Sequence, residues 1–330
     1  MMITRQTSAL LFLDVFKDYL EDPTVTEITV NRPGEVWFER RGQWHCVSQP
    51  NVSMVHLESL GIAIATFSHQ KWDMQNPLLS ASLPNGERIQ LVMPPAVESD
   101  CISMTLRKPS FVNYSLADFS AAGLFKQVRA TDTTTNPNDI ELARLLAERD
   151  YEAFFRLSVR ARKNIIVSGP TGSGKTTFMK GLVQEIPLEE RLITIEDVRE
   201  LFLPHPNRVH LLYSKGQQGA ADYVTPKKLL ESCLRMKPDR ILLAELRGDE
   251  CLYFVRTAAS GHPGSITSCH AGSTALAFEQ LAIMIQDSPS GASLSFEVIQ
   301  RLLRLTIDII VQFDCHAGNR FISEIYFNKS

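Results

Sequence analysis

The residues from 169 to 176 combine glycines, a lysine and a hydroxyl group in the spacing that holds a polyphosphate. They read Gly169-Pro170-Thr171-Gly172-Ser173-Gly174-Lys175-Thr176 and fit the pattern G-x-x-x-x-G-K-[ST]. Glycines let successive backbone N–H groups curl around phosphate oxygens, while the following helix directs its positive end at the same charge. Lys175 would reach the outer phosphates, and Thr176 would hold Mg²⁺ through its hydroxyl. This pattern predicts a site for a nucleoside triphosphate, with Thr177 as a further binding residue.

Four apolar segments that are typical of buried strands each end in a polar cluster. They are Ile165–Ser168 before the phosphate loop, Leu192–Ile195 before Glu196 and Asp197, Ile241–Ala244 before Glu245, and Ser265–Cys269 before His270. The first segment argues against an incidental glycine-rich turn, because a strand is what a phosphate loop must follow. In a parallel sheet, ligands bind at the carboxyl ends of the strands. We therefore expect the four clusters to meet at one edge of a sheet.

The carboxylates in these clusters are candidates for catalysis and metal binding. Glu245 is the expected catalytic acid, since nucleotide hydrolysis needs a carboxylate beside Mg²⁺ to orient or deprotonate water. The alternative is a helix N-terminal carboxylate, which the helix dipole also favours. Glu196 and Asp197 could supply a second carboxylate near the metal or its waters, or could be solvated or capping residues. The expected Mg²⁺ ligands, direct or through water, are Thr176, Glu196 and Glu245.

Two histidines around the fourth segment, His262 and His270, are candidates for sensing a γ-phosphate, because histidine changes its charge near neutral pH. Zinc binding by Cys269, His270 and His262 is disfavoured, since their spacing matches no common zinc site. Either histidine taken alone could instead be a core residue whose ring the backbone satisfies.

Composition indicates a soluble globular protein of two or three domains. The chain has 330 residues, of which 44% are hydrophobic and 22% are charged. A net charge of −3 gives no overall basic field of the kind that attracts nucleic acid or an anionic membrane. The six cysteines lack C-x-x-C spacing, and no run of about eighteen apolar residues occurs. We expect reduced thiols in the cytoplasm, no membrane-spanning segment and no export signal.

Two patterns divide the chain. Residues 1–106 are predicted to form a small α+β domain, in which one amphipathic helix ends near Leu20 and another covers about Met54–Phe67. Its expected strands, separated by turn residues, are Glu27–Val30, Glu35–Glu39, Gln43–Val47, Leu79–Leu83 and Arg88–Met93. Residues 107–138, with a polar run from Thr131 to Asn138, are expected to be a linker. Helical and strand patterns alternate through 139–330, which predicts an α/β domain with a mostly parallel sheet.

Four motifs in order resemble those of the hexameric traffic ATPases of type II and type IV secretion, conjugation and type IV pili. The motifs are GPTGSGKT from Gly169, ITIEDVREL from Ile193, LRMKPDRILLAELRGDE from Leu234 and SGHPGSITSCHAGS from Ser260. The segments LPNGERIQLVMPPA from Leu83 and SMTLRKPS from Ser103 are similar to the compact type IV secretion and conjugation branch. The longer family members carry a large extra N-terminal region and a four-cysteine metal module, and we expect neither in this protein.

This resemblance implies a RecA-like ATPase domain and a homohexamer at the cytoplasmic face of the bacterial inner membrane. ATP and Mg²⁺ would be the cofactors, and hydrolysis would drive pilus assembly or substrate transfer. The expected partners are inner-membrane secretion-channel components, other secretion ATPases and a secreted protein or nucleoprotein. Contact with the membrane would be peripheral, and no sequence-specific nucleic acid is expected.

The resemblance also implies roles for single residues. Glu196 belongs to the family's Asp box, Glu245 is its acidic catalytic residue and His270 anchors its His box. Arg235 resembles the arginine that reaches the γ-phosphate, and Arg107 the N-domain arginine that closes over the nucleotide, since guanidinium pairs well with phosphate oxygens. Arg107 could instead form a surface or interdomain salt bridge. Which subunit each arginine serves stays open.

Three other functions fit part of the sequence. A nucleic-acid motor such as a ring helicase shares the phosphate loop, although the acidic balance disfavours it. A small-molecule kinase would leave the clusters at Glu196, Glu245 and His270 without a common explanation. A nucleotide-gated scaffold that turns over very slowly is the non-enzymatic alternative.

Overall fold

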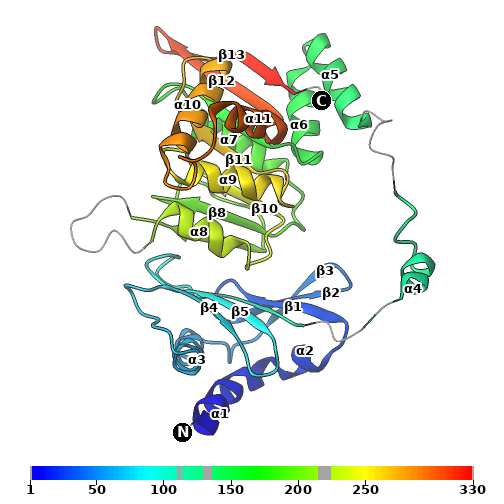
Figure 1. Cartoon of the computed structure of the whole chain (residues 1–330), viewed down its shortest axis with the longest axis vertical. Helices are drawn as coiled ribbons and strands as arrows, with labels where there is room; N and C mark the ends of the chain where they lie inside the picture. The colour runs from blue at the N-terminus through cyan, green and yellow to red at the C-terminus, as the bar shows by residue number, and fades with distance from the viewer. Residues whose placement is uncertain (1, 110–112, 114, 129–135, 215–223, 329–330) are drawn as a thin grey trace.

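The computed structural model describes residues 2–109, 113, 115–128, 136–214 and 224–328, and these fold around two sheets. Figure 1 shows the N-terminal sheet and its helices below the C-terminal sheet and its helices, with α4 (Leu116–Ala121) to one side of both. The predicted combination of a small α+β region followed by an α/β region is confirmed.

The N-terminal sheet is antiparallel throughout, in the order β3-β2-β1-β6-β5-β4. Its strands are β1 (Val25–Val30), β2 (Glu35–Arg40), β3 (Gln43–Ser48), β4 (Leu78–Ser82), β5 (Arg88–Val92) and β6 (Ser103–Arg107). Five of them match the expected segments, because period-two alternation between turn residues is a strong strand signal. β6 is not among the predicted strands, although Ser99 and Asp100 precede it and Pro109 follows it.

The two faces of this sheet differ in chemistry. Its helical elements are α1 (Met2–Leu13), η1 (Asp14–Phe16), α2 (Lys17–Glu21) and α3 (Met54–Phe67). On the face that α3 covers, side chains such as Ile28, Leu60 and Leu106 form an apolar core. The opposite face carries buried polar side chains, among them Thr29 and Thr105. A buried polar face requires hydrogen-bond partners from another part of the chain.

The C-terminal sheet has the order β13-β12-β7-β11-β10-β8-β9, and it is parallel except where β13 pairs with β12. Its strands are β7 (Ile165–Ser168), β8 (Leu192–Glu196), β9 (Arg208–Leu212), β10 (Arg240–Leu243), β11 (Ile266–Cys269), β12 (Ile309–His316) and β13 (Asn319–Phe327). The four central strands, β7, β8, β10 and β11, are the four that the sequence predicts. They are buried along their whole length, as parallel strands covered on both faces must be.

Helices cover both faces of this sheet. They are α5 (Pro137–Glu148), α6 (Tyr151–Arg160), α7 (Lys175–Gln184), α8 (Pro226–Cys233), α9 (Glu250–Ala259), α10 (Thr274–Asp287) and α11 (Phe296–Thr306). One core joins α5, α6 and α7 to the sheet. A separate core joins α8, α9, α10 and α11 to it. The result is a three-layer domain. Among the described residues, no helix combines the length and apolar character needed to cross a bilayer.

The predicted linker, 107–138, lies only partly within the described residues. Its positions 110–112, 114 and 129–135 fall outside them, and so does most of the polar run up to Asn138. Within the described part, Arg107 is the last residue of β6, α4 occupies six residues, and α5 begins at Pro137. The exact domain boundaries stay predictions.

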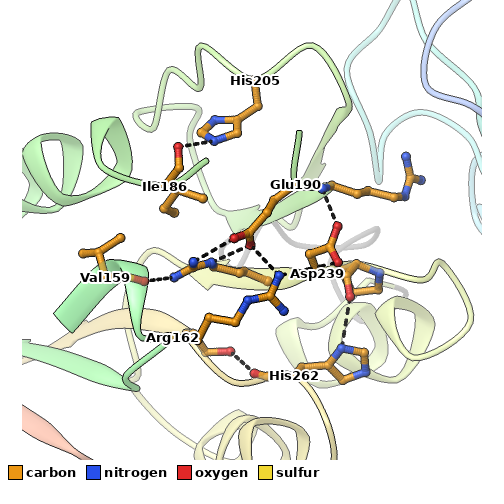
Figure 2. Close-up of polar contacts among 12 residues, drawn as sticks. Val159, Arg162, Ile186, Glu190, His205, Asp239 and His262 are labelled. Atoms are coloured by element: carbon orange, nitrogen blue, oxygen red, sulfur yellow. Dashed lines mark hydrogen bonds and ion pairs between the residues drawn. The ribbon is translucent and has the colours of Figure 1, made fainter. Parts of the chain in front are cut away.

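A buried ionic network fixes the amino-terminal ends of β8 and β10. The guanidinium of Arg240 donates to both carboxylate oxygens of Glu190, at 2.7 and 2.9 Å, and to the carbonyl of Val159 at 2.7 Å. Figure 2 shows the side chain of Arg162 close to the carboxylates of both Glu190 and Asp239. Asp239 then accepts the backbone N–H of Arg191 at 2.7 Å. The network therefore ends at Arg191, the residue immediately before β8.

The side chain of Arg191 joins this network to the N-terminal sheet. It is completely buried, and it donates to the side-chain oxygens of Asn31 at 2.6 Å and Asn207 at 2.5 Å. Thr29 and Thr105, on the polar face of the N-terminal sheet, lie 3.4 and 3.5 Å from it. Burial lowers the pKa of Arg191 to about 10, so it remains a cation near neutral pH. This buried cation is therefore one of the contacts that hold the two sheets together.

Replacing Arg191 with Met should destabilise the protein by about 3 kcal/mol, because charge-assisted hydrogen bonds are lost and their acceptors stay buried. Urea unfolding followed by tryptophan fluorescence would measure this change. Arg160→Met is the matched control, since Arg160 is exposed at the end of α6 and should change stability by less than about 0.5 kcal/mol. Equal midpoints for the Arg191 variant and the wild type would contradict the role of this cation.

Candidate active site

The phosphate loop connects β7 to α7, as its motif requires. Gly174 caps α7 with a φ of +99°, in the left-handed region, and Gly172 has a φ of +75°. A Cβ atom added to Gly169, whose φ is +149°, would lie 2.6 Å from the carbonyl oxygen of Phe313. Glycine is therefore required at these turns by backbone conformation and by close packing against β12. Pro170, Thr171 and Ser173 complete the loop.

Lys175 is folded onto the loop that precedes it. Its ammonium donates to the carbonyl oxygens of Gly169 at 2.6 Å and Pro170 at 2.9 Å, and the residue is only 8% exposed. Burial lowers the pKa of Lys175, while the carboxylate of Glu245 acts in the opposite direction. A buried cation held mainly by neutral carbonyls fits a polyphosphate, whose negative charge would stabilise it.

The strand order brings three of the predicted residues into contact. β7, β11 and β10 are adjacent in the sheet, so the phosphate loop, His270 and Glu245 follow one another along its carboxyl edge. The ammonium of Lys175 lies 3.4 Å from Nδ1 of His270, and Nε2 of His270 lies 2.7 Å from a carboxylate oxygen of Glu245. A neutral histidine that accepts from Lys175 and donates to Glu245 satisfies both contacts. The result is a continuous polar chain from the phosphate loop to the carboxylate.

Two residues that sequence reasoning misses hold Glu245 in position. Arg247 pairs with the second carboxylate oxygen of Glu245. Glu250 is buried at the start of α9, and its carboxylate accepts the backbone N–H groups of Arg247 at 2.5 Å and Gly248 at 3.0 Å. Both residues lie in the motif that contains Glu245, but the pairing depends on the turn between β10 and α9. The motif alone gives no signal for it.

Glu196 lies at the same edge but is fully enclosed. Its carboxylate accepts the backbone N–H groups of Glu200 at 2.9 Å and Leu201 at 2.8 Å, and the hydroxyl of Thr194 at 2.9 Å. His210, on β9, lies 3.7 Å away. Burial alone would raise the pKa of Glu196, but the nearby His210 ring and the hydrogen bonds from the backbone and Thr194 outweigh it and lower the pKa. Glu196 therefore stays ionised and organises the loop after β8, and half-buried Asp197 follows it.

The residues at this edge fit ATP and Mg²⁺ when the nucleotide supplies part of the metal coordination. Thr176 and Thr177 stand in the first turn of α7, next to the loop. In the described part of the chain, no group of three or more His, Cys, Asp or Glu side chains is arranged to hold a metal ion alone. Mg²⁺ in proteins is usually bound by one or two protein ligands together with substrate phosphates and water. Thr176 and Glu245 match this requirement.

The two candidate arginines lie elsewhere. Arg107 and Arg235 both line a cleft of about 1270 Å³ between the N-terminal sheet and the α8–β10 connection, and none of the phosphate-loop residues lines it. His262 lines the same cleft, and its Nδ1 lies 3.2 Å from the carbonyl of Pro238. Arg235 precedes β10, whereas Glu245 follows it, so they belong to opposite edges of the parallel sheet. Within this chain, neither arginine belongs to the cluster around Lys175.

Comparison with known proteins gives a consistent result. Residues 14–312 match the family model described as Type II/IV secretion system protein. The chain is 50% identical to the type IV secretion system protein VirB11 of Brucella suis over 99% of its length and 92% of that protein. It is 43% identical to VirB11 of Bartonella henselae, covering 96% and 92%, and 40% identical to PtlH of Bordetella pertussis, covering 95% and 92%. The crystal structure of the Brucella suis VirB11 ATPase with sulphate superposes with a TM-score of 0.93 at 49% identity, covering 99% and 96%.

Replacing Gly169 with Ala should weaken ATP binding by roughly 10- to 100-fold, since backbone strain of about 1–3 kcal/mol would distort the loop. Gly181→Ala is the matched control. Gly181 lies in α7 with open space around its Cα, so alanine there should stabilise the helix by about 1 kcal/mol and leave affinity unchanged. Titration with a fluorescent ATP analogue, alongside thermal unfolding, would measure both effects. Equal affinity for the two variants would contradict this account of the loop.

Proposed function

The chain belongs to the Type II/IV secretion system protein family, and from this premise we propose how its residues carry out ATP hydrolysis in a type IV secretion system. The observation that supports the mechanism best is the contact chain from Lys175 through His270 to Glu245. It joins a phosphate-binding cation to a carboxylate that is held by Arg247.

We propose that Lys175 and the backbone of the phosphate loop bind the β- and γ-phosphates of ATP. When bound, Mg²⁺ would neutralise charge on these phosphates, and Thr176 is the residue best suited to hold it. Glu245 orients a water molecule and accepts its proton. His270 holds the Glu245 carboxylate close to Lys175, and Glu196 orders the neighbouring loop.

We further propose that the working unit is a homohexamer in which Arg107 and Arg235 act on the nucleotide of a neighbouring subunit. The support is their position in the interdomain cleft, on the side of the sheet away from Lys175. A ring of identical head-to-tail interfaces would bring the cleft of one subunit to the phosphate loop of the next. Arginine suits this task because it remains charged and pairs with phosphate oxygens.

The same premise supports a place in the secretion apparatus. We propose that the hexamer works peripherally at the cytoplasmic face of the inner membrane, together with the channel components and other ATPases of the system. Its cargo would be a secreted protein or nucleoprotein. Relatives at 50% identity that carry the name of a type IV secretion system protein favour this function over a nucleic-acid motor, a kinase or a scaffold.

Glu245→Gln should lower kcat for ATP hydrolysis by about 10²- to 10⁴-fold while ATP still binds, because glutamine keeps the shape of the side chain but cannot accept a proton. Lys175→Ala should weaken binding itself. Phosphate release and analogue titration would separate the two defects. Lys180→Ala, one turn further along α7 and packed over Phe202, is the control that should keep wild-type turnover. Wild-type rates in folded Glu245→Gln protein would refute the assignment.

Glu245→Gln protein with MgATP should have a solution mass of about six times the chain mass of 37.1 kDa, measured by light scattering. A monomer or dimer at micromolar concentration would contradict the ring.

The neighbouring-subunit role of Arg235 can be tested by mixing two inactive variants, Lys175→Ala and Arg235→Gln. In random mixed rings, about a quarter of the interfaces would join an intact Lys175 to an intact Arg235, so part of the activity should return. If both residues serve the nucleotide of their own subunit, mixing should restore nothing.

A further inference from the structure

A row of charged side chains crosses the polar face of the N-terminal sheet. Arg88 on β5 pairs in register with Arg107 on β6, which pairs with Glu27 on β1, which pairs with Glu39 on β2. All four residues line the interdomain cleft. Directly opposed residues on neighbouring strands are close enough for their side chains to interact. The conformation of Arg107 therefore depends on the residues beside it in this row.

The two carboxylates of the row are in different situations. Glu39 is well paired, since one of its oxygens accepts the hydroxyl of Thr26 at 2.6 Å and also contacts the ammonium of Lys237. Glu27 is 3% exposed, and one of its oxygens lies 3.5 Å from Nε of Arg107. Its other oxygen, Oε2, has no hydrogen-bond partner among the described residues. Glu27 is therefore a buried carboxylate whose closest cation is Arg107.

A carboxylate in this position destabilises the fold. Burial raises the pKa of Glu27 to about 7, although the cations Lys237, Arg107 and Arg191 oppose the shift and Glu39 adds to it. An uncharged side chain of the same shape would avoid this cost. The Arg107 side chain, by contrast, is 70% exposed, so its guanidinium reaches the cleft while Nε faces Glu27. The pair thus joins a buried carboxylate to an exposed cation.

We propose that Glu27 is a positioning residue, which holds Arg107 through Nε and so directs its two terminal NH₂ groups toward the phosphates of a nucleotide. This inference rests on the role proposed above for Arg107. A guanidinium has donors on several sides, so one side can be tied to a carboxylate while the other pairs with phosphate. Fixing the geometry in advance lowers the entropy lost when the phosphate arrives.

The direct test is a double-mutant cycle on kcat/KM for ATP with Glu27→Gln, Arg107→Gln and the double variant. We expect each single change to lower kcat/KM by about tenfold and the double variant to be no worse than Arg107→Gln, because Glu27 acts only through Arg107. Glu27→Asp should recover part of the loss. Glu39→Gln, in the same row but paired with Lys237, is the control and should stay within about twofold of wild type.

The pH dependence separates positioning from a general structural role. Below about pH 7 Glu27 becomes protonated. The kcat/KM of the wild type should therefore fall to that of Glu27→Gln below this pH and exceed it at higher pH. The stability of the wild type should depend on pH in the opposite sense, and it should be greater at low pH. A carboxyl pKa raised from 4.5 to about 7 on folding means that wild-type stability falls as pH rises through this range. Glu27→Gln should therefore unfold at a higher temperature than wild type at about pH 8 and at the same temperature near pH 4.

Three results would overturn the inference: wild-type kcat/KM in Glu27→Gln, wild-type kcat/KM in Arg107→Gln, or additive losses in the double variant. Lower stability of Glu27→Gln at about pH 8 would assign Glu27 a structural role instead. These outcomes are distinct from failure of the proposed function. In that case, wild-type protein itself would show no hydrolysis that depends on Lys175 and Glu245.

Discussion

The buried cation Arg191 is the constraint on which the arrangement of the two sheets depends. A guanidinium without access to water must find acceptors, and Asn31, Thr29 and Thr105 on the N-terminal sheet provide them. This requirement explains why one face of that sheet is polar although it is buried. It also defines the cleft, because the same face extends past Arg191 to Glu27 and Arg107.

Arg191 also connects the cleft with the catalytic edge. It begins the segment that runs through β8 to Glu196, five residues later, where the carboxylate orders the next loop. Asp239, which holds the backbone of Arg191, immediately precedes β10, and β10 leads to Glu245. Two short, fully buried strands therefore link the interdomain contacts at one edge of the sheet with the active site at the other. A shift of the N-terminal sheet would act on both strands at their amino ends.

The sequence predicted the features that depend on local pattern. The phosphate loop, the four central strands and the polar residues at their ends follow from glycine spacing and apolar runs, and parallel pairing then brings Lys175, His270 and Glu245 together. The contacts of Arg247 and Arg191 could not be predicted in this way. They depend on a particular turn or on residues up to 162 positions away, for which a single sequence carries no periodic signal. β12 and β13 follow the last recognised motif, so no polar cluster identified them.

Under the roles proposed for Arg107 and Arg235, one described chain does not complete its own site. β10 separates Arg235 at its amino end from Glu245 at its carboxyl end, and four residues at about 3.3 Å each span about 13 Å, more than an arginine side chain reaches. Lys175, at the carboxyl edge, is a buried cation that neutral carbonyls and His270 contact, while Arg107, in the cleft, lies beside the carboxylate of Glu27. Lys175 would gain directly from the approach of a nucleotide, and the exposed guanidinium of Arg107 would gain an anionic partner in addition to Glu27. The proposed ring, which would bring the cleft of one subunit to the phosphate loop of the next, would therefore let both cations pair with one nucleotide.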